Sequence, residues 1–140
     1  MDKKDRAILD ELTKDSRQSW KEIGEKVFLT GQAVGQRVLT MQTCGIIERF
    51  TIDKKTDYLQ FITIYMSSNQ FSSFENTVKS YNQIIEFYKI TGDGCYFIKS
   101  CFDKFELTLF LEKIEHYCRY KVSHQLKKLS PHNHAEKYTL

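Results

Sequence analysis

Residues 20–47 read WKEIGEKVFLTGQAVGQRVLTMQTCGII, and this stretch decides the fold of the first part of the chain. Its apolar spacing predicts two short helices joined by a tight turn, with a glycine just after the second helix. Two helices joined in this way form a helix-turn-helix, in which the second helix enters the major groove of DNA. We therefore expect this stretch to bind double-stranded DNA.

Capping residues indicate where these helices begin. Ser19 and Glu22 form an S-x-x-E capping box, so the first helix of the pair is expected to begin at Ser19. Thr30 is a suitable N-cap for the second helix, and Gly45 suits its left-handed stop. Another amphipathic helix is expected over 5–14. The stripes that should face one another in a small core are Ile8, Leu9, Leu12, Trp20, Ile23, Val27, Phe28, Val34, Val38 and Met41.

The outward side of the helix expected over 30–44 supplies the candidate DNA-binding residues. Glutamine pairs with adenine through two hydrogen bonds, so Gln32 and Gln36 are the base-reading candidates. Thr30, at the helix start, suits a phosphate, and Arg37 on the flank could reach phosphate or guanine. The outward and flanking positions also include Thr40, Thr43 and Leu39. The alternative is that all of these are solvated residues of a surface helix.

The composition is that of an ordinary globular protein. The chain has 140 residues, of which 41% are hydrophobic and 28% charged. No apolar run approaches the roughly 18 residues of a membrane span. The first residues, MDKKDRAILDEL, lack the apolar core of a signal peptide. We therefore expect a cytoplasmic protein with no membrane contact.

The formal net charge of +3 is spread along the chain. Residues 1–52 contain nine Lys and Arg and eight Asp and Glu. This balance would not by itself indicate a nucleic-acid-binding protein. DNA affinity must then come from local placement of residues, or from several weak sites linked in an oligomer.

Signs of catalytic, metal or cofactor chemistry are absent from the sequence. The four cysteines, Cys44, Cys95, Cys101 and Cys118, show no C-x-x-C spacing and are expected to be free thiols. His132 and His134 lie in a polar tail without a completing ligand, so no metal site is expected. Paired carboxylates, a nucleophile–histidine pair and a phosphate loop are not found. We expect no enzyme activity and no cofactor.

The second part of the chain has a different pattern. A short strand is expected over 46–52, and DKKTD at 53–57 is a polar break. The domains expected are therefore a helix-turn-helix domain at 1–52, a linker at 53–60 and a second domain at 61–140. That domain should contain strands over 61–66, 84–91, 95–102 and 122–129, a helix over 72–80 capped by Ser72 and Glu75, a helix over 103–118 opened by a D-x-x-E cap, and a polar tail or exchanged edge over 131–140.

The order strand-helix-strand-strand-helix-strand predicts an α+β, ferredoxin-like fold, with an antiparallel four-stranded sheet and both helices on one face. Both faces of this sheet should be apolar, because Phe61, Tyr65, Phe87 and Phe97 alternate with Ile62, Ile64, Tyr88, Ile90, Tyr96 and Ile98. A face that no helix covers needs a partner. We expect a dimer formed by packing of two sheets.

Thr91-Gly92-Asp93-Gly94 is a turn with two interpretations. Its backbone N–H groups and Asp93 could hold the carboxylate and amino groups of a small amino acid. Alternatively, it is a hairpin turn in which Gly92 and Gly94 only supply positive φ angles.

These features together resemble the Lrp/AsnC family of leucine-responsive, feast/famine regulators. DRAILDELTKDSR, from Asp5, resembles the family's opening D-x-x-I-L-x-x-L-x-x-D-x-R. LTGQAVGQRVLTMQTCGII, from Leu29, resembles its helix-turn-helix signature, and FYKITGDGCYFIKS, from Phe87, resembles its effector region. The resemblance implies DNA binding by the first domain, and dimers and octamers formed by the second. It also implies an amino-acid effector near Gly92, Asp93 and Gly94.

The sequence departs from the family pattern in three places. Gly35 lies in the middle of the helix expected to enter the major groove, and that helix has few charged residues. Cys95 stands where many members have an acidic residue. The main hypothesis is a sequence-specific transcriptional regulator that an amino acid modulates. The alternatives are an interaction module whose helices bind protein, and an architectural DNA-binding protein without a small-molecule effector.

Overall fold

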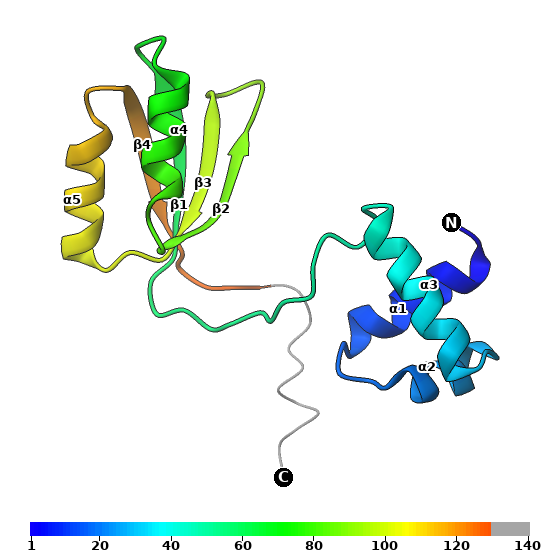
Figure 1. The fold of residues 1–140 in the computed structure, drawn as a ribbon. Coiled ribbons are helices and arrows are strands. Elements are labelled where there is room, and N and C mark those ends of the chain that lie inside the picture. Colours follow the sequence, from blue (N-terminus) through cyan, green and yellow to red (C-terminus); the bar gives the residue numbers. More distant parts are fainter. Residues whose placement is uncertain (130–140) are drawn as a thin grey trace. The chain divides into compact units, whose positions relative to one another are not determined.

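The structure is a computed structural model that describes residues 1–129. The chain divides into two compact units at residues 54 and 55. We call residues 1–54 the headpiece and residues 55–129 the sheet domain. The described headpiece contains helices only, whereas the sheet domain contains both strands and helices (Figure 1).

Three helices form the headpiece: α1 (Lys3–Lys14), α2 (Trp20–Val27) and α3 (Gly31–Thr43). The expected capping box of Ser19 and Glu22 opens α2, and the Thr30 hydroxyl accepts a hydrogen bond from the Ala33 amide at the start of α3. Gly45, at φ +78°, ends α3 as predicted. These three predictions are confirmed. Helix α1 begins two residues earlier than predicted, because Asp2 caps it.

The headpiece core differs from the prediction at two aromatic residues. The fully or nearly buried side chains are Ile8, Leu12, Ile23, Val27, Val34, Val38 and Met41. Phe28 is 86% exposed because α2 ends at Val27 and the chain turns away at Phe28. Trp20 is 38% exposed and lies against Gly35 on α3. The prediction that both aromatic residues face the core was therefore wrong.

The strand predicted over 46–52 does not form. The amides of Ile46 and Ile47 instead donate to the Met41 carbonyl oxygen, over 2.8 and 3.1 Å, and so continue the end of α3. A strand needs a neighbouring strand to take up its backbone hydrogen bonds. The described part of this chain places none beside residues 46–52.

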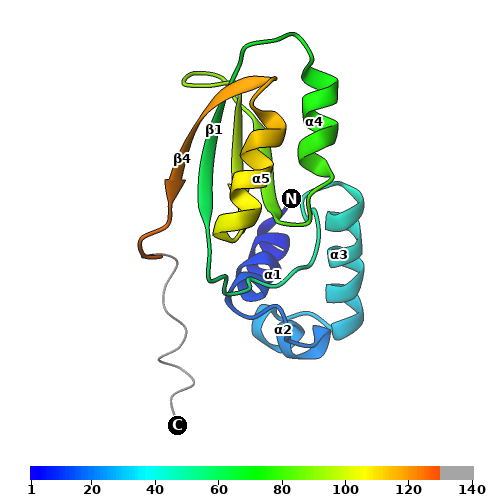
Figure 2. The same ribbon diagram turned by 90° about the vertical axis from the view of Figure 1, so that its left-hand side faces the viewer.

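The sheet domain confirms the ferredoxin-like prediction. Its strands lie in the order β2-β3-β1-β4, and every neighbouring pair is antiparallel. Two helices, α4 and α5, cover one face of the sheet (Figures 1 and 2). The elements are β1 (Gln60–Met66), α4 (Phe71–Lys79), β2 (Ile84–Lys89), β3 (Tyr96–Ser100), α5 (Lys104–Ile114) and β4 (Cys118–His124).

Several boundaries in this domain differ from the prediction. Helix α4 begins at Phe71 without a side-chain cap, because Ser72 is already helical and Glu75 accepts a hydrogen bond from the Tyr96 hydroxyl (2.6 Å). The final strand was predicted over 122–129. It spans Cys118–His124 instead, because it pairs along β1 and His124 pairs with the first β1 residue, Gln60. The tail predicted over 131–140 lies outside the described residues.

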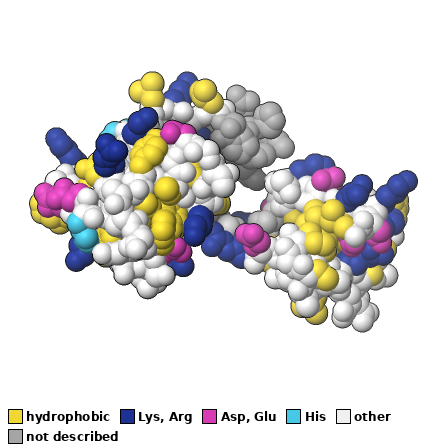
Figure 3. Space-filling model, turned by 90° about the horizontal axis from the view of Figure 1, so that it is seen from above, with side chains coloured by type: hydrophobic (Ala, Val, Ile, Leu, Met, Phe, Trp, Pro, Cys, Tyr) yellow, Lys and Arg dark blue, Asp and Glu magenta, His cyan; other side chains and the backbone are white. Residues whose placement is uncertain are grey.

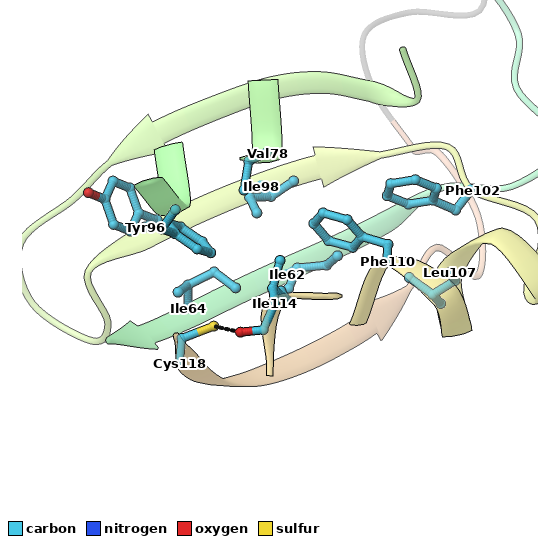
Figure 4. Close-up of a cluster of buried hydrophobic side chains, with 11 residues drawn as sticks. Ile62, Ile64, Val78, Tyr96, Ile98, Phe102, Leu107, Phe110, Ile114 and Cys118 are labelled. Atoms are coloured by element: carbon cyan, nitrogen blue, oxygen red, sulfur yellow. Dashed lines mark hydrogen bonds between the residues drawn. The ribbon is translucent and has the colours of Figure 1, made fainter. Parts of the chain in front are cut away.

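The core of the sheet domain lies between the sheet and its two helices (Figure 4). Aromatic rings of α5 and of the segments that follow α4 and β3 pack against one another. Phe102 and Phe110 stack with centroids 4.7 Å apart, and Tyr81 meets Phe110 edge-on at 5.0 Å. Gln60 is buried at one end of this core. Its side-chain oxygen accepts hydrogen bonds from the Ser100 hydroxyl and the Phe102 amide, and its side-chain nitrogen donates to the Phe102 carbonyl oxygen. This core makes the sheet a rigid support for residues on its other face.

Candidate functional site

A close backbone approach sets the angle between α2 and α3. The amide of Leu29 donates to the Gly24 carbonyl oxygen over 2.9 Å. A Cβ at Gly24 would lie only 2.4 Å from the Leu29 carbonyl oxygen, and one at Gly31 would lie 3.2 Å from the Lys21 amide nitrogen. Glycine at both positions allows the two helices to approach as a helix-turn-helix requires.

The outward face of α3 is accessible, as predicted from its periodicity, and is polar apart from Leu39. The five residues on this face are all exposed: Gln32, Gln36, Leu39, Thr40 and Thr43. Within residues 1–129, the amide groups of Gln32 and Gln36 make no hydrogen bond. The hydroxyls of Thr40 and Thr43 donate to backbone carbonyls one turn earlier. The two glutamine amides therefore remain available to bond the edges of bases.

Arg37 was predicted on the flank of this face, within reach of phosphate or guanine. Its guanidinium is instead directed toward the start of α1. Its Nη1 atom donates to Asp2 Oδ2 over 2.7 Å and to Asp5 Oδ1 over 3.1 Å, so the guanidinium is held against the start of α1. These bonds raise the pKa of Arg37 above its ordinary value. The side-chain hydrogen bond from Arg37, followed by the amide of Asp5, lowers the pKa of Asp2 to about 2.

Lys21 is a further candidate for a phosphate contact that was not predicted from sequence. It is exposed in the first turn of α2, and its backbone lies against Gly31 at the start of α3. A cation at this place is close to the α3 amides that suit a phosphate. No local pattern reveals it, because the contact joins two helices. Elsewhere, basic and acidic side chains are interspersed on the face seen in Figure 3, without a large basic patch.

The turn at 91–94 depends on its glycines. Gly92 has φ +107° and Gly94 has φ +100°, values that favour glycine. A Cβ at Gly94 would also lie 2.6 Å from the Thr63 Cγ2 atom. The turn therefore lies tightly against β1, and its carboxylate has a specific partner: Asp93 accepts a hydrogen bond from the Tyr65 hydroxyl over 2.8 Å.

The face of the sheet opposite α4 and α5, which we call the open face, carries a hollow beside this turn. The hollow has a volume of about 350 Å³ and is lined by Tyr65, Asp93, Arg119, Tyr120 and Lys121. Arg119 pairs with Tyr65 in the sheet, and the Lys121 ammonium lies 5.6 Å from the Tyr65 ring centroid. A carboxylate, a phenol and two cations are groups that suit a small zwitterion.

Of the residues that line this hollow, only Asp93 was predicted from sequence as a site residue, together with its neighbours Gly92 and Gly94 in the turn. The other lining residues, Tyr65, Arg119, Tyr120 and Lys121, were not predicted. These residues come together through the pairing of β1 with β4, and β4 was predicted to begin four residues later, at Val122. The correct strand register was the missing signal.

The open face also carries apolar side chains, although not all those expected. Phe61 and Phe97 stack with centroids 6.3 Å apart, and both are half-buried. Phe87 lies on the helix-covered side, where it pairs with Ile98, and Tyr88 takes its place on the open face. A β-bulge between Ile84 and Glu86 shifts the alternation by one residue, so the predicted faces of Phe87 and Tyr88 were wrong.

Within residues 1–129, no three His, Cys, Asp or Glu side chains are placed to hold a metal ion. All four cysteines are free thiols. Over the same range, none of the helices has the length and apolar character needed to cross a bilayer.

Comparison with protein families matches both parts of the chain. Residues 1–42 match the AsnC-type helix-turn-helix domain, and residues 59–132 match the Lrp/AsnC ligand binding domain. Relatives are similar over nearly the whole length. The transcriptional regulator LrpB of Bacillus subtilis is 31% identical over 94% of this chain and 93% of its own. LrpA of the same organism is 35% identical over 88% of this chain and 96% of its own.

Solved structures have the same fold. Bacillus subtilis LrpC superposes with a TM-score of 0.83 at 24% identity, over 93% of this chain and 97% of that one. A transcriptional regulator of Neisseria meningitidis in complex with L-methionine superposes with a TM-score of 0.81 at 20% identity, over 94% and 93% of the two chains.

Proposed function

Because this chain belongs to the Lrp/AsnC family of transcriptional regulators, we propose that it recognises operator DNA through the outward face of α3 and that a small amino acid modulates this binding. The helix-turn-helix domain is the DNA-binding part, and the second domain is a ligand-binding domain. The relatives described above are transcriptional regulators, and we assign the chain no catalytic role.

The observation that carries the DNA-binding proposal is the pair of exposed glutamines on α3. Gln32 and Gln36 are one turn apart on the helix that follows the tight turn, and both reach the same side. Each can form two hydrogen bonds with an adenine in the major groove. Thr40 and Thr43 continue this face and could contact bases or sugar.

Phosphate contacts in this proposal come from the start of α3 and from α2. Thr30 and the first amides of α3 form a helix N-terminus, which favours an anion. Lys21 adds one positive charge beside it. Each neutralised phosphate contributes about 0.9 to the dependence of log affinity on log salt, so one headpiece should show a shallow salt dependence. Useful affinity then requires two or more headpieces on one DNA.

The open face supports a dimer that would bring two headpieces together. Its half-buried rings, Phe61 and Phe97, lie on the sheet face opposite α4 and α5, which no helix of the described sheet domain covers (Figure 2). Apolar sheet faces of this kind are usually packed against another layer. A Phe97→Lys variant should sediment at a lower mass than the unaltered protein, whereas an unchanged mass would exclude this interface. Assembly beyond the dimer, to an octamer, remains a prediction from the family.

The hollow on the open face supports the effector proposal. Asp93, positioned by the Tyr65 hydroxyl, could bind the amino group of an amino acid. Arg119 or Lys121 could bind its carboxylate, and the amides around Gly92 and Gly94 could add hydrogen bonds. The related Neisseria meningitidis regulator was solved with L-methionine, which supports an amino acid as the class of ligand.

Selection of bound fragments from genomic DNA, followed by electrophoretic shift of the selected sequences, tests the DNA-binding proposal. We expect a few enriched, partly palindromic, A/T-rich sequences. Binding of all fragments with equal affinity would indicate an architectural protein. No shift even at low salt would contradict DNA binding and favour a headpiece that binds protein.

A further inference from the structure

The capping box of α1 uses half of its carboxylate oxygens and leaves the other half for α3. Asp2 Oδ1 accepts from the Asp5 amide over 2.9 Å, and Asp5 Oδ2 accepts from the Asp2 amide over 3.2 Å. The other oxygen of each carboxylate accepts from Arg37 Nη1, over 2.7 and 3.1 Å. One guanidinium nitrogen therefore joins the middle of α3 to both carboxylates of the box.

The buried core shared by α1 and α3 is apolar. Ile8 of α1 packs in the same core as Val34 and Val38 of α3. Burial of the apolar stripe sets which side of α3 faces the core, but packing alone is less directional than a hydrogen bond and leaves room for small rotations of the helix about its axis. Charge-assisted hydrogen bonds are directional. Among residues 1–129, the bonds of Arg37 to Asp2 and Asp5 are the only side-chain hydrogen bonds between α1 and α3.

Arg37 directly follows Gln36 in the sequence, so its bonds to Asp2 and Asp5 hold α3 at a position next to the middle of the outward face. Successive helix residues are about 100° apart, and a modest rotation of α3 would turn the Gln36 amide away from a base pair. Arg37 is also unsuited to leave this tether for DNA. If its guanidinium moved to a phosphate, Asp2 and Asp5 would remain unpaired beside a polyanion.

We propose that Arg37 is a positioning residue whose pairing with Asp2 and Asp5 fixes the rotation of α3, so that Gln32 and Gln36 meet the base edges. This inference rests on the proposed use of α3 to read DNA. It replaces a direct role of Arg37 at phosphate or guanine with an indirect role through the two carboxylates.

The double variant Asp2→Asn, Asp5→Asn distinguishes a positioning role of Arg37 from a direct DNA contact, because the two roles predict opposite changes in operator affinity. Asparagine still caps a helix, so α1 keeps its start while the charges that hold Arg37 are removed. If Arg37 positions α3, operator affinity falls by about tenfold, the size of one lost base contact, whereas affinity for non-operator DNA is retained or rises slightly. If Arg37 contacts DNA directly, losing two negative charges strengthens binding to both DNAs, which would overturn the proposal.

A matched control corrects for the change in net charge. Asp10→Asn with Glu25→Gln removes two exposed carboxylates from the same headpiece and leaves Arg37 paired. We expect this control to bind operator and non-operator DNA with the same ratio as the unaltered protein. If its operator preference falls as far as that of the Asp2, Asp5 variant, charge alone explains the effect and the tether is excluded.

Variants of Arg37 complete a double-mutant cycle with the Asp2, Asp5 variant. Arg37→Gln should lower operator preference, and its effect should not add to that of the Asp2, Asp5 variant, because both remove the same contact. Arg37→Lys should restore most of the preference, since an ammonium can lie between the same carboxylates. Additive effects would overturn the proposal. Fluorescence of Trp20, the single tryptophan, checks that each headpiece is folded during the binding measurement.

The ratio of operator to non-operator affinity is the decisive measurement, because loss of folded protein lowers both affinities together. If the unaltered protein itself shows no operator preference, the proposed function fails. If that preference exists but the Asp2, Asp5 variant keeps it, only the role assigned to Arg37 fails.

Discussion

Gly24 and Leu29 contact each other twice across the turn between α2 and α3. The Leu29 amide donates to the Gly24 carbonyl oxygen over 2.9 Å, and the Leu29 carbonyl oxygen occupies the place where a Gly24 side chain would begin, 2.4 Å from an ideal Cβ. The hydrogen bond closes the turn. The close approach of the Leu29 carbonyl oxygen leaves no room for a side chain at Gly24. The proposed recognition of DNA by α3 therefore depends on a residue that need not touch DNA.

Gly24→Ala should destabilise the headpiece by about 1–3 kcal/mol, because the methyl group meets backbone that cannot rotate away. This net value already includes the gain of about 1 kcal/mol in helix propensity. Urea unfolding followed by Trp20 fluorescence measures it, since the single tryptophan lies in α2. Glu25→Ala, at an exposed neighbouring position, is the control and should stay within about 0.5 kcal/mol. Equal stability of the two variants would show that the turn adjusts.

Phe28→Gly should be more stable than Phe28→Ala by about 1 kcal/mol. Phe28 has φ +61° and is 86% exposed, so the left-handed backbone is strained and the ring is largely outside the core. Both variants lose the contact with the Lys4 ammonium, 5.4 Å from the ring centroid, so their difference isolates the backbone strain. Urea midpoints provide the comparison, and an alanine variant as stable as the glycine variant would refute it.

Gln36→Ala should weaken operator binding about tenfold and leave binding to non-operator DNA unchanged, because one two-bond base contact is lost. Gln42→Ala is the matched control, since Gln42 is exposed on α3 but lies to the side of the outward face. Titration of labelled operator and non-operator duplexes measures both. If the two variants bind alike, the outward face of α3 is not the reading surface.

The headpiece should become less stable as the pH falls from about 4 toward about 2. The Arg37 side chain lowers the pKa of Asp2 from its ordinary 3.8 to about 2, so the unfolded chain takes up this proton first. Stability from this pair is complete above pH 3.8 and is lost as the pH approaches 2. Asp2→Asn should therefore lose less stability on acidification than the unaltered headpiece. Parallel pH profiles for the two proteins would contradict the assigned pair.

Tyr65→Phe should lower the affinity for an amino-acid effector by about tenfold, because the Asp93 carboxylate loses the hydroxyl that orients it. Calorimetric titration with each of the twenty amino acids identifies the ligand in the unaltered protein and then measures the variant. Tyr58→Phe removes an exposed hydroxyl outside the lining of the hollow and should have no effect. Heat from none of the twenty would exclude an amino acid as effector.

The starts of α2, α3 and α5 were readable from sequence because their capping hydrogen bonds are local. The boxes of Ser19 with Glu22 and of Asp103 with Glu106 each join residues three positions apart. The order of elements and the apolar stripes likewise predicted the α+β architecture, since right-handed crossovers leave few alternatives. Thr30 and Gly45 were predicted for the same local reason.

Strand limits were less readable because they depend on the partner strand. His124 ends β4 where β1 begins at Gln60, and neither residue carries a local signal for that limit. The bulge after Ile84 reversed the faces assigned to Phe87 and Tyr88. A change of one residue in register reverses every following side chain, so a local pattern cannot predict the open face reliably.

The sequence by itself determined that a helix-turn-helix precedes a ferredoxin-like domain, and which residues of α3 face outward, because helical period and capping act within a few residues. Only the tertiary structure decided that Arg37 belongs to Asp2 and Asp5, 35 and 32 residues away, and that Tyr65 and Arg119 join Asp93 around one hollow. These partners meet through packing of separate elements, and the free energy of such packing is spread over the whole core rather than encoded in neighbouring residues.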